Sequence, residues 1–475
     1  MKRLISCVFA LLYVMTGFAS GTWILHGKEY RVDTLYHAYI GPGTTQTSIK
    51  LAGPVNLRVF YTTTDLKNEN VDVRAIKHKD TLTGLGTVSN AAESHSTSNR
   101  SYFAGINADF FSSSMPCGIT VVDGEVYCSD QASGWSLFGI DANKIPYSGG
   151  GDFYVKLTAP DYSTAELSAM NLERETNGLV LYSSRKGANT GTDSNGSEVV
   201  LVPDGEGNFL TPGATVRMRV QGNPSHAGSM PIPDNGYILS GSGTKESFVS
   251  NLSEGDVVEV RCAIRFNGFT GGKIQQALGG CPMLVSGGKV LDTENALDHL
   301  TSAQPRTAVG YNAEKNKLVM LVADGRSSIS VGPISKVLAD IMIYAGCSEA
   351  MNFDGGGSST FYVKGEGVIN QPSDGSERSV TDGLYLSTDA PQNDVTITTI
   401  RFMDYAKTLN QGDAYTPVIY GYNQYGVLVD RNVEGVTLSC GSSLGTITND
   451  GTTLNASGSG THMLTCLLYT SDAAD

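Results

Sequence analysis

Short runs in which apolar and polar residues alternate, separated by Gly, Asn and Asp, recur along the sequence from about Trp23 to Asp389. Such alternation is typical of β-strands with one buried face, and the residues between the runs are those that form tight turns. Glycine accounts for 56 of the 475 residues, above its usual share of roughly 7%. These features predict a β-rich fold with many turns, and the length excludes a lone small module.

The net charge of the chain is -14 at pH 7. A strongly acidic chain is not attracted over a broad surface to nucleic acid or to an anionic membrane. Hydrophobic residues make up 40% of the sequence and charged residues 17%, which is typical of a globular chain. We therefore expect a globular protein with no nucleic-acid partner.

The first residues resemble a secretory signal peptide. Lys2 and Arg3 precede an apolar stretch from Leu4 to Phe18, and Ala19 completes a small-x-small exit from it. This order of charge, apolar run and small residues is that of a cleaved signal, and we expect cleavage after Ala19. The apolar stretch is too short for a membrane span and none follows it. A secreted or periplasmic protein is therefore expected.

Two of the eight cysteines, Cys117 and Cys128, flank an alternating run that turns at Asp123-Gly124. This pattern predicts a hairpin that carries both thiols. An oxidising compartment permits a disulfide between them, and free thiols are the alternative. No Cys or His pair has the spacing of a zinc site.

The character of the sequence changes after a linker at residues 389–394, Asp-Ala-Pro-Gln-Asn-Asp. Strand-like runs then recur at the short intervals of an immunoglobulin-like sandwich. From 394 to 465 there are only 72 residues, fewer than the roughly 100 of a complete domain of this kind. The last ten residues do not continue the pattern. We expect a signal peptide at 1–19, a main domain at 20–390, an incomplete Ig-like domain at 394–465 and a non-native tail at 466–475.

A β-α-β unit is predicted between residues 304 and 360. Ala308 to Tyr311 and Leu318 to Ala323 form a hairpin pattern, and Gly332-Pro333 opens a helical pattern that Gly346 closes. The run Ala350 to Phe353 follows as a strand, and it should be parallel to the strand that ends at Ala323. The predicted fold class is therefore α+β, with a β-rich core that contains this unit and a truncated Ig-like β-sandwich after it.

Polar residues follow the ends of these strands. One strand ends in Asp324-Gly325-Arg326, the other in Asp354-Gly-Gly-Gly-Ser358, and the hairpin partner begins at Pro305-Arg306-Thr307. Because ligands gather beyond the carboxyl ends of such strands, we expect these segments to share one rim. The buried run Tyr102 to Ile106 contributes a fourth element, since it ends in Asn107-Ala108-Asp109.

Such a rim suits recognition of a phosphate group. Arginine matches phosphate oxygens in bidentate fashion, and consecutive glycines let backbone N–H groups approach an anion. Aspartates next to a phosphate would hold a metal, stabilise a developing cation or activate water. Each signal also has a structural interpretation: Asp-Gly is a common turn, a glycine triplet can be a flexible turn, and both arginines could pair with surface carboxylates.

The sequence resembles the phosphodiester glycosidase family in five ordered blocks, and weaker similarity extends the match over roughly 90 to 388. The blocks are Ile106 to Phe111, Gly280 to Val285, Pro305 to Thr307, Asp324 to Arg326 and Asn352 to Ser359. The resemblance implies an α+β catalytic core and a hydrolase that frees a sugar from an anomeric phosphodiester and leaves a phosphomonoester. One departure from the family pattern is Asp109, where many members carry Gly, so the role of that position stays open.

Rim and resemblance together give a set of candidate residues. Catalytic roles are expected for Asp354, Asp324 and Asp109. Substrate contacts are expected for Asn107, Arg306, Thr307, Arg326, Gly355, Gly356, Gly357, Ser358 and Ser359. In this hypothesis the arginines and glycine amides hold the phosphate, Asp354 or Asp324 faces the sugar, and Asn107 orients a hydroxyl.

The expected substrate is a glycosyl phosphodiester, such as an N-acetylglucosaminyl phosphodiester, or a phosphorylated glycan. No cofactor is required, although a divalent cation is compatible with the aspartates. One alternative is a non-catalytic glycan-binding or phosphate-binding protein of the cell surface, whose Ig-like module could contact glycan. Another is a phosphodiesterase that breaks the P–O bond with a metal held by Asp109, Asp324 and Asp354.

Overall fold

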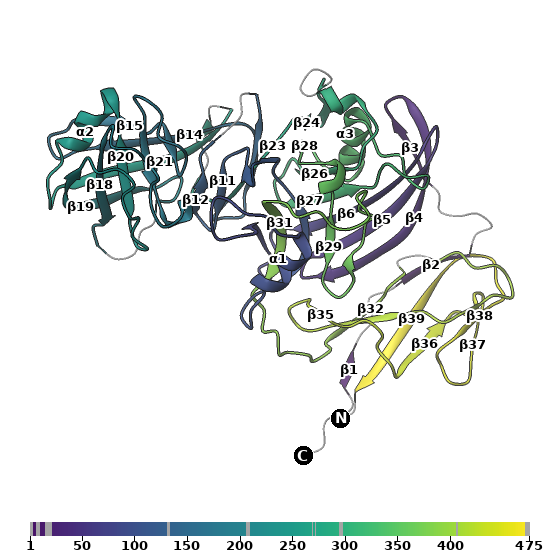
Figure 1. Ribbon diagram of the computed structural model, residues 1–475. Helices are drawn as coiled ribbons and strands as arrows, with labels where there is room; N and C mark the ends of the chain where they lie inside the picture. The colour runs from purple at the N-terminus through teal and green to yellow at the C-terminus, as the bar shows by residue number, and fades with distance from the viewer. Residues whose placement is uncertain are drawn as a thin grey trace, which may run out of the picture.

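The computed structural model describes residues 3–5, 10–14, 21–130, 134–205, 210–267, 269–270, 272–293, 298–404 and 407–470. Most of the signal peptide expected at 1–19, including its cleavage point, lies outside the described residues, as do residues 471–475 of the expected tail. The structure is β-rich, as the alternating sequence predicts (Figure 1).

Nine of the described strands form an antiparallel sheet at the centre of the molecule, and successive neighbours are hydrogen-bonded. In spatial order they are β25 (Lys289–Val290), β24 (Met283–Ser286), β28 (Glu349–Asn352), β26 (Arg306–Tyr311), β27 (Lys317–Ala323), β6 (Asn56–Asp65), β5 (Thr44–Ala52), β4 (Lys28–Gly41) and β3 (Gly21–Leu25). Residues of β26 and β27 are almost entirely buried, in keeping with the apolar runs that predicted them.

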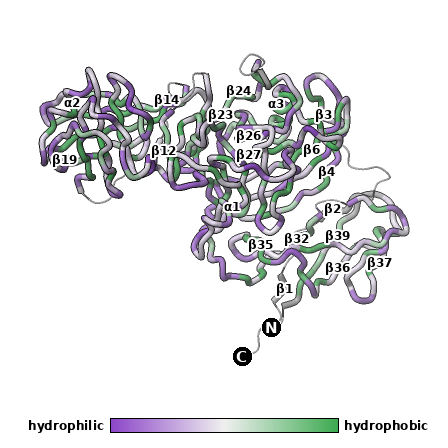
Figure 2. The backbone as a smooth tube through the Cα atoms, in the orientation of Figure 1, coloured by the Kyte–Doolittle hydropathy of each residue, from purple (hydrophilic) through white to green (hydrophobic). Residues whose placement is uncertain are grey.

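A second sheet packs against one face of the first. It contains β30 (Gly367–Val368), β29 (Phe361–Val363), β8 (Ser101–Asn107), β31 (Asp382–Thr388) and β7 (Asp72–Lys77). One hydrophobic cluster joins the two sheets, with Val309 and Met320 on one side and Ile106 and Leu384 on the other. Figure 2 shows hydrophobic segments gathered around β26 and β27, inside these layers.

Helix α3 (Ser335–Tyr344) covers the opposite face of the nine-stranded sheet, where Leu338, Ile341 and Met342 enter a second cluster with Leu321. The helix ends before Gly346, which has φ +100°, a left-handed conformation that favours glycine. The predicted β-α-β unit is present. Strands β27 and β28 are parallel to each other, with β26 antiparallel between them.

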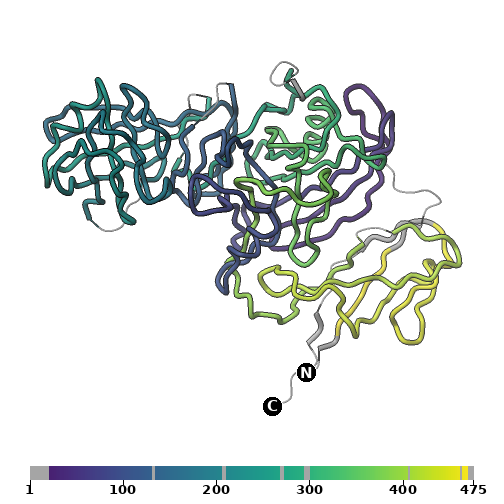
Figure 3. Tube along the Cα trace, in the orientation of Figure 1, coloured from purple at the N-terminus to yellow at the C-terminus, as the bar shows by residue number. Residues whose placement is uncertain are grey.

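The largest sheet extends from the core into a lobe built mostly by the middle of the chain, which Figure 3 shows as the blue to teal part at one end of the molecule. Its main path is β12 (Glu125–Cys128), β11 (Thr120–Val122), β23 (Ile274–Gly280), β13 (Ser136–Asp141), β14 (Pro146–Thr158), β21 (Val257–Phe266), β19 (Thr215–Ser225), β18 (Ser197–Pro203), β20 (Tyr237–Gly241), β17 (Leu179–Tyr182) and β16 (Ala169–Met170), while β15 (Thr164–Glu166) and β22 (Phe269–Thr270) pair with β14 and β21. Strands β13 and β23 contribute Phe138, Ile140 and Leu278 to the core cluster. They therefore tie the lobe to the central sheets.

Smaller elements complete this part of the chain. They are α1 (Val88–His95), α2 (Glu246–Ser250), the 3-10 helices η1 (Ser184–Lys186), η2 (Gly243–Lys245), η3 (Asp298–Thr301) and η4 (Gly356–Ser358), and the pair β9 (Phe111–Ser112) and β10 (Met115–Pro116).

The predicted hairpin at Asp123-Gly124 is formed by β11 and β12. Cys117 and Cys128 are both free thiols, so the disulfide considered above is not formed in the structure. None of the helices in the described part of the chain has the length and apolar character that a membrane crossing needs.

The C-terminal region forms small sheets around a hydrophobic cluster of its own, which includes Ile400, Leu438 and Leu464. One sheet contains β32 (Thr399–Phe402), β34 (Ile419–Tyr422) and β35 (Leu428–Asp430), and a second contains β33 (Ala414–Tyr415), β38 (Leu454–Ala456) and β37 (Gly445–Ile447). In a third sheet β39 (Gly460–Thr470) pairs with β36 (Val436–Cys440), β1 (Arg3–Ile5) and β2 (Ala10–Val14). Residues 466–470, expected to belong to a non-native tail, continue β39, and Cys466 is buried in the cluster.

Candidate active site

Three strand ends meet at one edge of the nine-stranded sheet, as the sequence predicts. Arg306 at the start of β26 pairs with Ala323 at the end of β27, and Ala308 pairs with Asn352 at the end of β28. Asp324 and Asp354 follow these strand ends in the chain. The register therefore brings the segments that begin at 305, 324 and 354 to a common rim.

The loop after β28 holds its glycines against the neighbouring segment. The amide of Gly356 donates to the carbonyl of Pro305 at 2.9 Å, and a Cβ on Gly355 would lie 2.8 Å from the same oxygen. Gly356 has φ +62°, which side chains rarely adopt. The loop can therefore follow this path only because these positions carry no side chain.

Asp354 is the half-buried carboxyl of this rim. Burial raises its pKa to about 6, against the opposing effect of hydrogen bonds from the Ser358 hydroxyl and the Gly355 amide and of the charge of Arg378. A carboxyl whose pKa lies near neutrality can hold or release a proton under physiological conditions, which is typical of catalytic acids and bases. Asp354 is thus the best placed of the expected catalytic residues.

Two exposed arginines flank the glycine loop. The Arg326 guanidinium lies over Gly356, 3.1 Å from the position of a Cβ there, and its Nε donates to Gln304 Oε1 at 2.7 Å. Arg378 lies over Gly357, and its Nη1 is 3.5 Å from Ser358 Oγ. Arg326 was expected here, whereas sequence reasoning missed Arg378. Arg378 lies in the stretch of weaker similarity to the family, which extends over roughly 90 to 388, and this was a signal that could have identified it.

Arg378 is already paired with a carboxylate. Its Nε and Nη2 lie 2.8 and 2.6 Å from Asp374 Oδ2, and the Asp374 carboxylate, like the guanidinium, lies over Gly357. Both side chains remain partly exposed, at 42% and 36%. An anionic group of the chain therefore lies where an arginine fork could bind an external anion.

Arg306 is not presented to the rim. Its side chain is 1% exposed, and it donates to the carbonyl oxygens of Ser302, Pro333 and Leu300 at 2.9, 3.3 and 3.4 Å. Burial lowers its pKa to about 10, and the charge of Arg326 adds to this effect. The geometry thus assigns Arg306 to holding the backbone behind the rim, in place of the phosphate contact expected from the sequence.

Asp324 is likewise buried, at 2% exposure. Its Oδ1 accepts from the Gln371 amide at 2.8 Å and from Asn370 Nδ2 at 3.4 Å. Burial raises its pKa, against these hydrogen bonds. The contacts place Asp324 beneath the segment that carries Asp374 and Arg378, where it positions that segment.

Asn107, Thr307 and Ser359 form a buried polar network below the loop. Thr307 Oγ1 lies 2.8 Å from Asn107 Oδ1 and 3.1 Å from Ser359 Oγ. The side-chain amide of Asn107 donates from Nδ2 to the main-chain carbonyl of Asp354 at 2.7 Å. Ser358 is also buried, beside Asp354 and Arg378. These side chains join β8 of one sheet to the rim of the other, and they fix the loop on which Asp354 lies.

Asp109 lies in a fully buried charged cluster with Asp382 and Lys77. Its amide donates to Asp382 Oδ1 at 2.9 Å, and its Oδ2 accepts from Gly118 at 2.8 Å. Burial, followed by the charge of Asp382, raises its pKa well above the ordinary value. Its Oδ1 has no hydrogen-bond partner among the described residues. Burial also raises the pKa of Asp382, and the charge of Lys77 opposes this effect.

Within the residues that the structure describes, no three His, Cys, Asp or Glu side chains are placed to hold a metal ion together. The charges of Asp382 and Asp354 act on Asp109, and that of Asp382 acts on Asp354, whereas Asp324 accepts hydrogen bonds from Gln371 and Asn370.

The rim places two arginines at a glycine loop beside Asp354, a carboxyl with a raised pKa. The family model described as phosphodiester glycosidase matches residues 213–387. This region, which is less than half of the chain, is similar to the phosphodiester glycosidase family and includes the rim from Arg306 to Arg378.

One curated relative is the SPbeta prophage-derived uncharacterized protein YomE of Bacillus subtilis (strain 168), which is 40% identical over 88 residues. That match covers 18% of this chain and 13% of the relative. The chain thus aligns with only a small part of the relative's length.

Two solved structures share the fold. A hypothetical protein from Synechocystis has a TM-score of 0.56 at 15% identity, covering 73% of this chain and 62% of that one. A protein described as exported from Burkholderia pseudomallei K96243 has a TM-score of 0.56 at 18% identity, covering 79% of this chain and 99% of that one. Zebrafish N-acetylglucosamine-1-phosphodiester alpha-N-acetylglucosaminidase aligns with a TM-score of 0.39 at 12% identity, covering 74% of this chain and 87% of that one.

Proposed function

We propose that the protein hydrolyses the glycosidic bond of a sugar-1-phosphodiester and releases the free sugar and a phosphomonoester. The observation that carries this proposal is the position of Asp354, whose pKa is about 6, beside two arginines and a glycine loop. An anion site next to such a carboxyl suits a reaction in which phosphate departs while positive charge develops on the sugar.

In the proposed reaction Arg326 and Arg378 hold the phosphate above Gly355 to Gly357. The bond between the anomeric carbon and the phosphate oxygen breaks, and its electron pair leaves with the phosphomonoester, which the arginines stabilise. The ionised Asp354 stabilises the positive charge at the anomeric carbon. Water then supplies the hydroxyl of the free sugar, and its proton passes to Asp354 or to solvent.

The proposal also includes the substrate, the localisation, the cofactor requirement and the role of the C-terminal region. The substrate is a glycosyl phosphodiester such as an N-acetylglucosaminyl phosphodiester, the protein is secreted or periplasmic after cleavage at Ala19, and no cofactor is needed. The C-terminal region 394–465 acts as an Ig-like module that contacts glycan or the cell surface. Its cluster around Ile400 and Leu438 supports a separate folding unit. The similar protein from Burkholderia pseudomallei, which is described as exported, supports export.

A release assay on the full chain tests the proposal. The protein is incubated with an α-N-acetylglucosaminyl phosphodiester, and free sugar and phosphomonoester are both quantified, with Asp354→Asn as the comparison. Equal release of the two products that is lost in the variant is expected. A folded protein that releases neither product from a panel of glycosyl phosphodiesters would favour the non-catalytic binding protein instead.

A further inference from the structure

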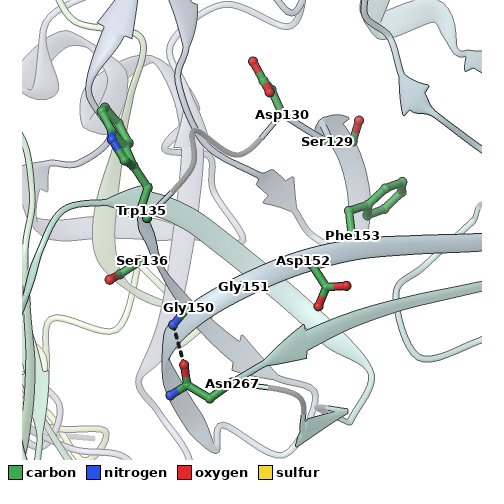
Figure 4. Close-up of a pocket in the computed structure, with 10 residues that line it drawn as sticks. Ser129, Asp130, Trp135, Ser136, Gly150, Gly151, Asp152, Phe153 and Asn267 are labelled. Atoms are coloured by element: carbon green, nitrogen blue, oxygen red, sulfur yellow. Dashed lines mark hydrogen bonds between the residues drawn. The ribbon is translucent and has the colours of Figure 1, made fainter.

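A pocket of about 700 Å³ lies where the large lobe meets the core, and no residue of the proposed reaction lines it. Trp135 and Phe153 lie on opposite sides of it with Asp130 between them, as Figure 4 shows. Asp152, Gly150 and Asn267 line its other side, and the Gly150 amide donates to Asn267 Oδ1 at 2.8 Å. The pocket is therefore built from residues of β13 and β14 together with Ser129, Asp130, Gly134, Trp135 and Asn267.

The pocket adjoins the active site through a short chain of contacts. The Asp354 amide donates to the Ala108 carbonyl at 2.9 Å, and Phe110 follows two residues after Ala108. The Phe110 ring meets the Trp135 ring edge to face, with centroids 5.0 Å apart. These contacts link Trp135, which lines the pocket, to the backbone segment that carries Asp354.

The charges of the pocket oppose those of the phosphate site. Asp130 and Asp152 supply carboxylates, and the nearby guanidinium of Arg265 is paired with Asp152. Carboxylates repel a phosphate, whereas they accept hydrogen bonds from hydroxyl groups. The aromatic faces of Trp135 and Phe153 provide apolar surface for the C–H face of a sugar ring.

We propose that this pocket, which we call the Trp135 pocket, binds an uncharged sugar unit of the substrate. This unit is separate from the sugar ring and the phosphate that the cleaved bond joins. That this sugar is part of a substrate rests on the proposed function, whereas binding of the sugar in the pocket does not require hydrolysis. The unit belongs either to the sugar that is released or to a glycan on the far side of the phosphate. Both sources present the same ring and hydroxyl chemistry to the pocket.

Fluorescence offers a direct test, because the chain contains 2 tryptophans. Trp23 lies on β3 and stacks on Tyr344, so Trp23→Phe leaves Trp135 as the tryptophan reporter at the pocket. Titration of this variant with methyl N-acetylglucosaminide and diacetylchitobiose should change the emission saturably, and inorganic phosphate should not. No saturable change across neutral mono- and disaccharides, or an equal response to phosphate, would overturn the proposal.

Further variants separate a sugar contact from a general effect on folding. Asp130→Asn in the Trp23→Phe background keeps the fluorophore and should weaken sugar binding about tenfold. An extended substrate carries one sugar unit more than the minimal glycosyl phosphodiester. Trp135→Phe keeps an aromatic face, so it should retain more of the preference for the extended over the minimal substrate than Trp135→Ala does. Unchanged sugar affinity in Asp130→Asn together with equal preferences in the two Trp135 variants would contradict the proposal.

Kinetics distinguish the two sources of the sugar. In Trp135→Ala, kcat/KM should fall about tenfold more for the extended substrate than for the minimal one. A selective loss on disaccharide-1-phosphodiesters assigns the pocket to the released sugar, and a selective loss on glycan-linked phosphates assigns it to the other side. Equal losses of kcat/KM on the minimal substrate, the disaccharide-1-phosphodiester and the glycan-linked phosphate would overturn the proposal. Sugar binding without any hydrolysis would retain the pocket and reject the proposed function.

Discussion

The side-chain amide of Asn107 donates to the main-chain oxygen of Asp354 at 2.7 Å. This contact joins the end of β8 in the five-stranded sheet to the loop after β28 in the nine-stranded sheet. Asn107 Oδ1 also accepts from the Thr360 amide at 3.1 Å. One buried side chain therefore holds both ends of the loop on which Asp354 lies.

Replacing Asn107 by Asp should displace this loop. The new carboxylate cannot donate to the Asp354 carbonyl, and leaving a buried acceptor unsatisfied costs about 1–3 kcal/mol. We expect kcat to fall at least about tenfold, since misplacement of a catalytic group is costly, and the free energy of unfolding to fall as well. Steady-state kinetics and denaturant unfolding measure the two effects. Asn99→Asp, at an exposed position, is the matched control, and an equal effect there would contradict this role.

The pKa of Asp354, raised to about 6 mainly by burial, predicts the pH dependence of activity. The proposed reaction uses the ionised carboxylate, so kcat/KM should rise with pH through about 6 and level off above it. A pH-rate profile of the full chain measures this rise. A profile that falls through the same range would show that Asp354 acts as an acid, which the proposed roles do not include.

The same shift predicts an effect on stability. Because the pKa of Asp354 in the folded protein lies above its ordinary value of 3.8, the folded state binds this proton more tightly than the unfolded state does. Its contribution to stability therefore decreases as pH rises from about 4 to about 6. Asp354→Asn removes this cost and should stabilise the protein at pH 8 by up to about 3 kcal/mol. Thermal unfolding at pH 4 and pH 8 checks the sign, since the gain should be absent at the lower pH.

Arg378→Ala should weaken substrate binding, because Arg378 offers a charged fork over Gly357. Hydrogen bonds to charged groups contribute about 1.5–3 kcal/mol, so we expect KM to rise at least about tenfold. Arg31→Ala removes an arginine from an exposed pair with Asp33 and serves as the control. Similar KM values for the wild type and both variants would remove Arg378 from the phosphate site.

Asp374→Asn tests the carboxylate that is paired with Arg378. In the structure this carboxylate lies where we place the phosphate, over Gly357. Neutralising it should free the arginine fork, so that KM and the inhibition constant of inorganic phosphate both fall several-fold. Asp33→Asn is the matched control on an exposed ion pair. A rise in both constants would show instead that Asp374 orients Arg378 for binding.

The sequence predicts the rim because its cause is local. Apolar runs identify β26, β27 and β28, the hairpin connection predicts that β26 and β27 are antiparallel, and the helical connection predicts that β27 and β28 are parallel. Asp354 and Arg326 therefore lie where strand ends place them. The sequence also indicates the cap of α3 at Gly346, since a helix end followed by a left-handed residue favours glycine.

Other parts of the site depend on contacts that local patterns do not contain. Arg306 was expected at the phosphate, but carbonyl groups of Ser302 and Pro333 close around its guanidinium. Arg378 reaches Gly357 from an irregular segment, so no periodicity marks it. Asp382 meets Asp109 only because β31 pairs with β8. Such placements arise from tertiary packing of segments far apart in the sequence.

The central claim is that the bond between sugar and oxygen is the one that breaks. Hydrolysis of an N-acetylglucosaminyl phosphodiester by the full chain in water enriched in oxygen-18 tests it most directly. Mass spectrometry of both products then locates the label, with Asp354→Asn as the control for non-enzymatic release. We predict the label in the free sugar and none in the phosphomonoester, whereas label in a phosphate product would show P–O cleavage and contradict the account.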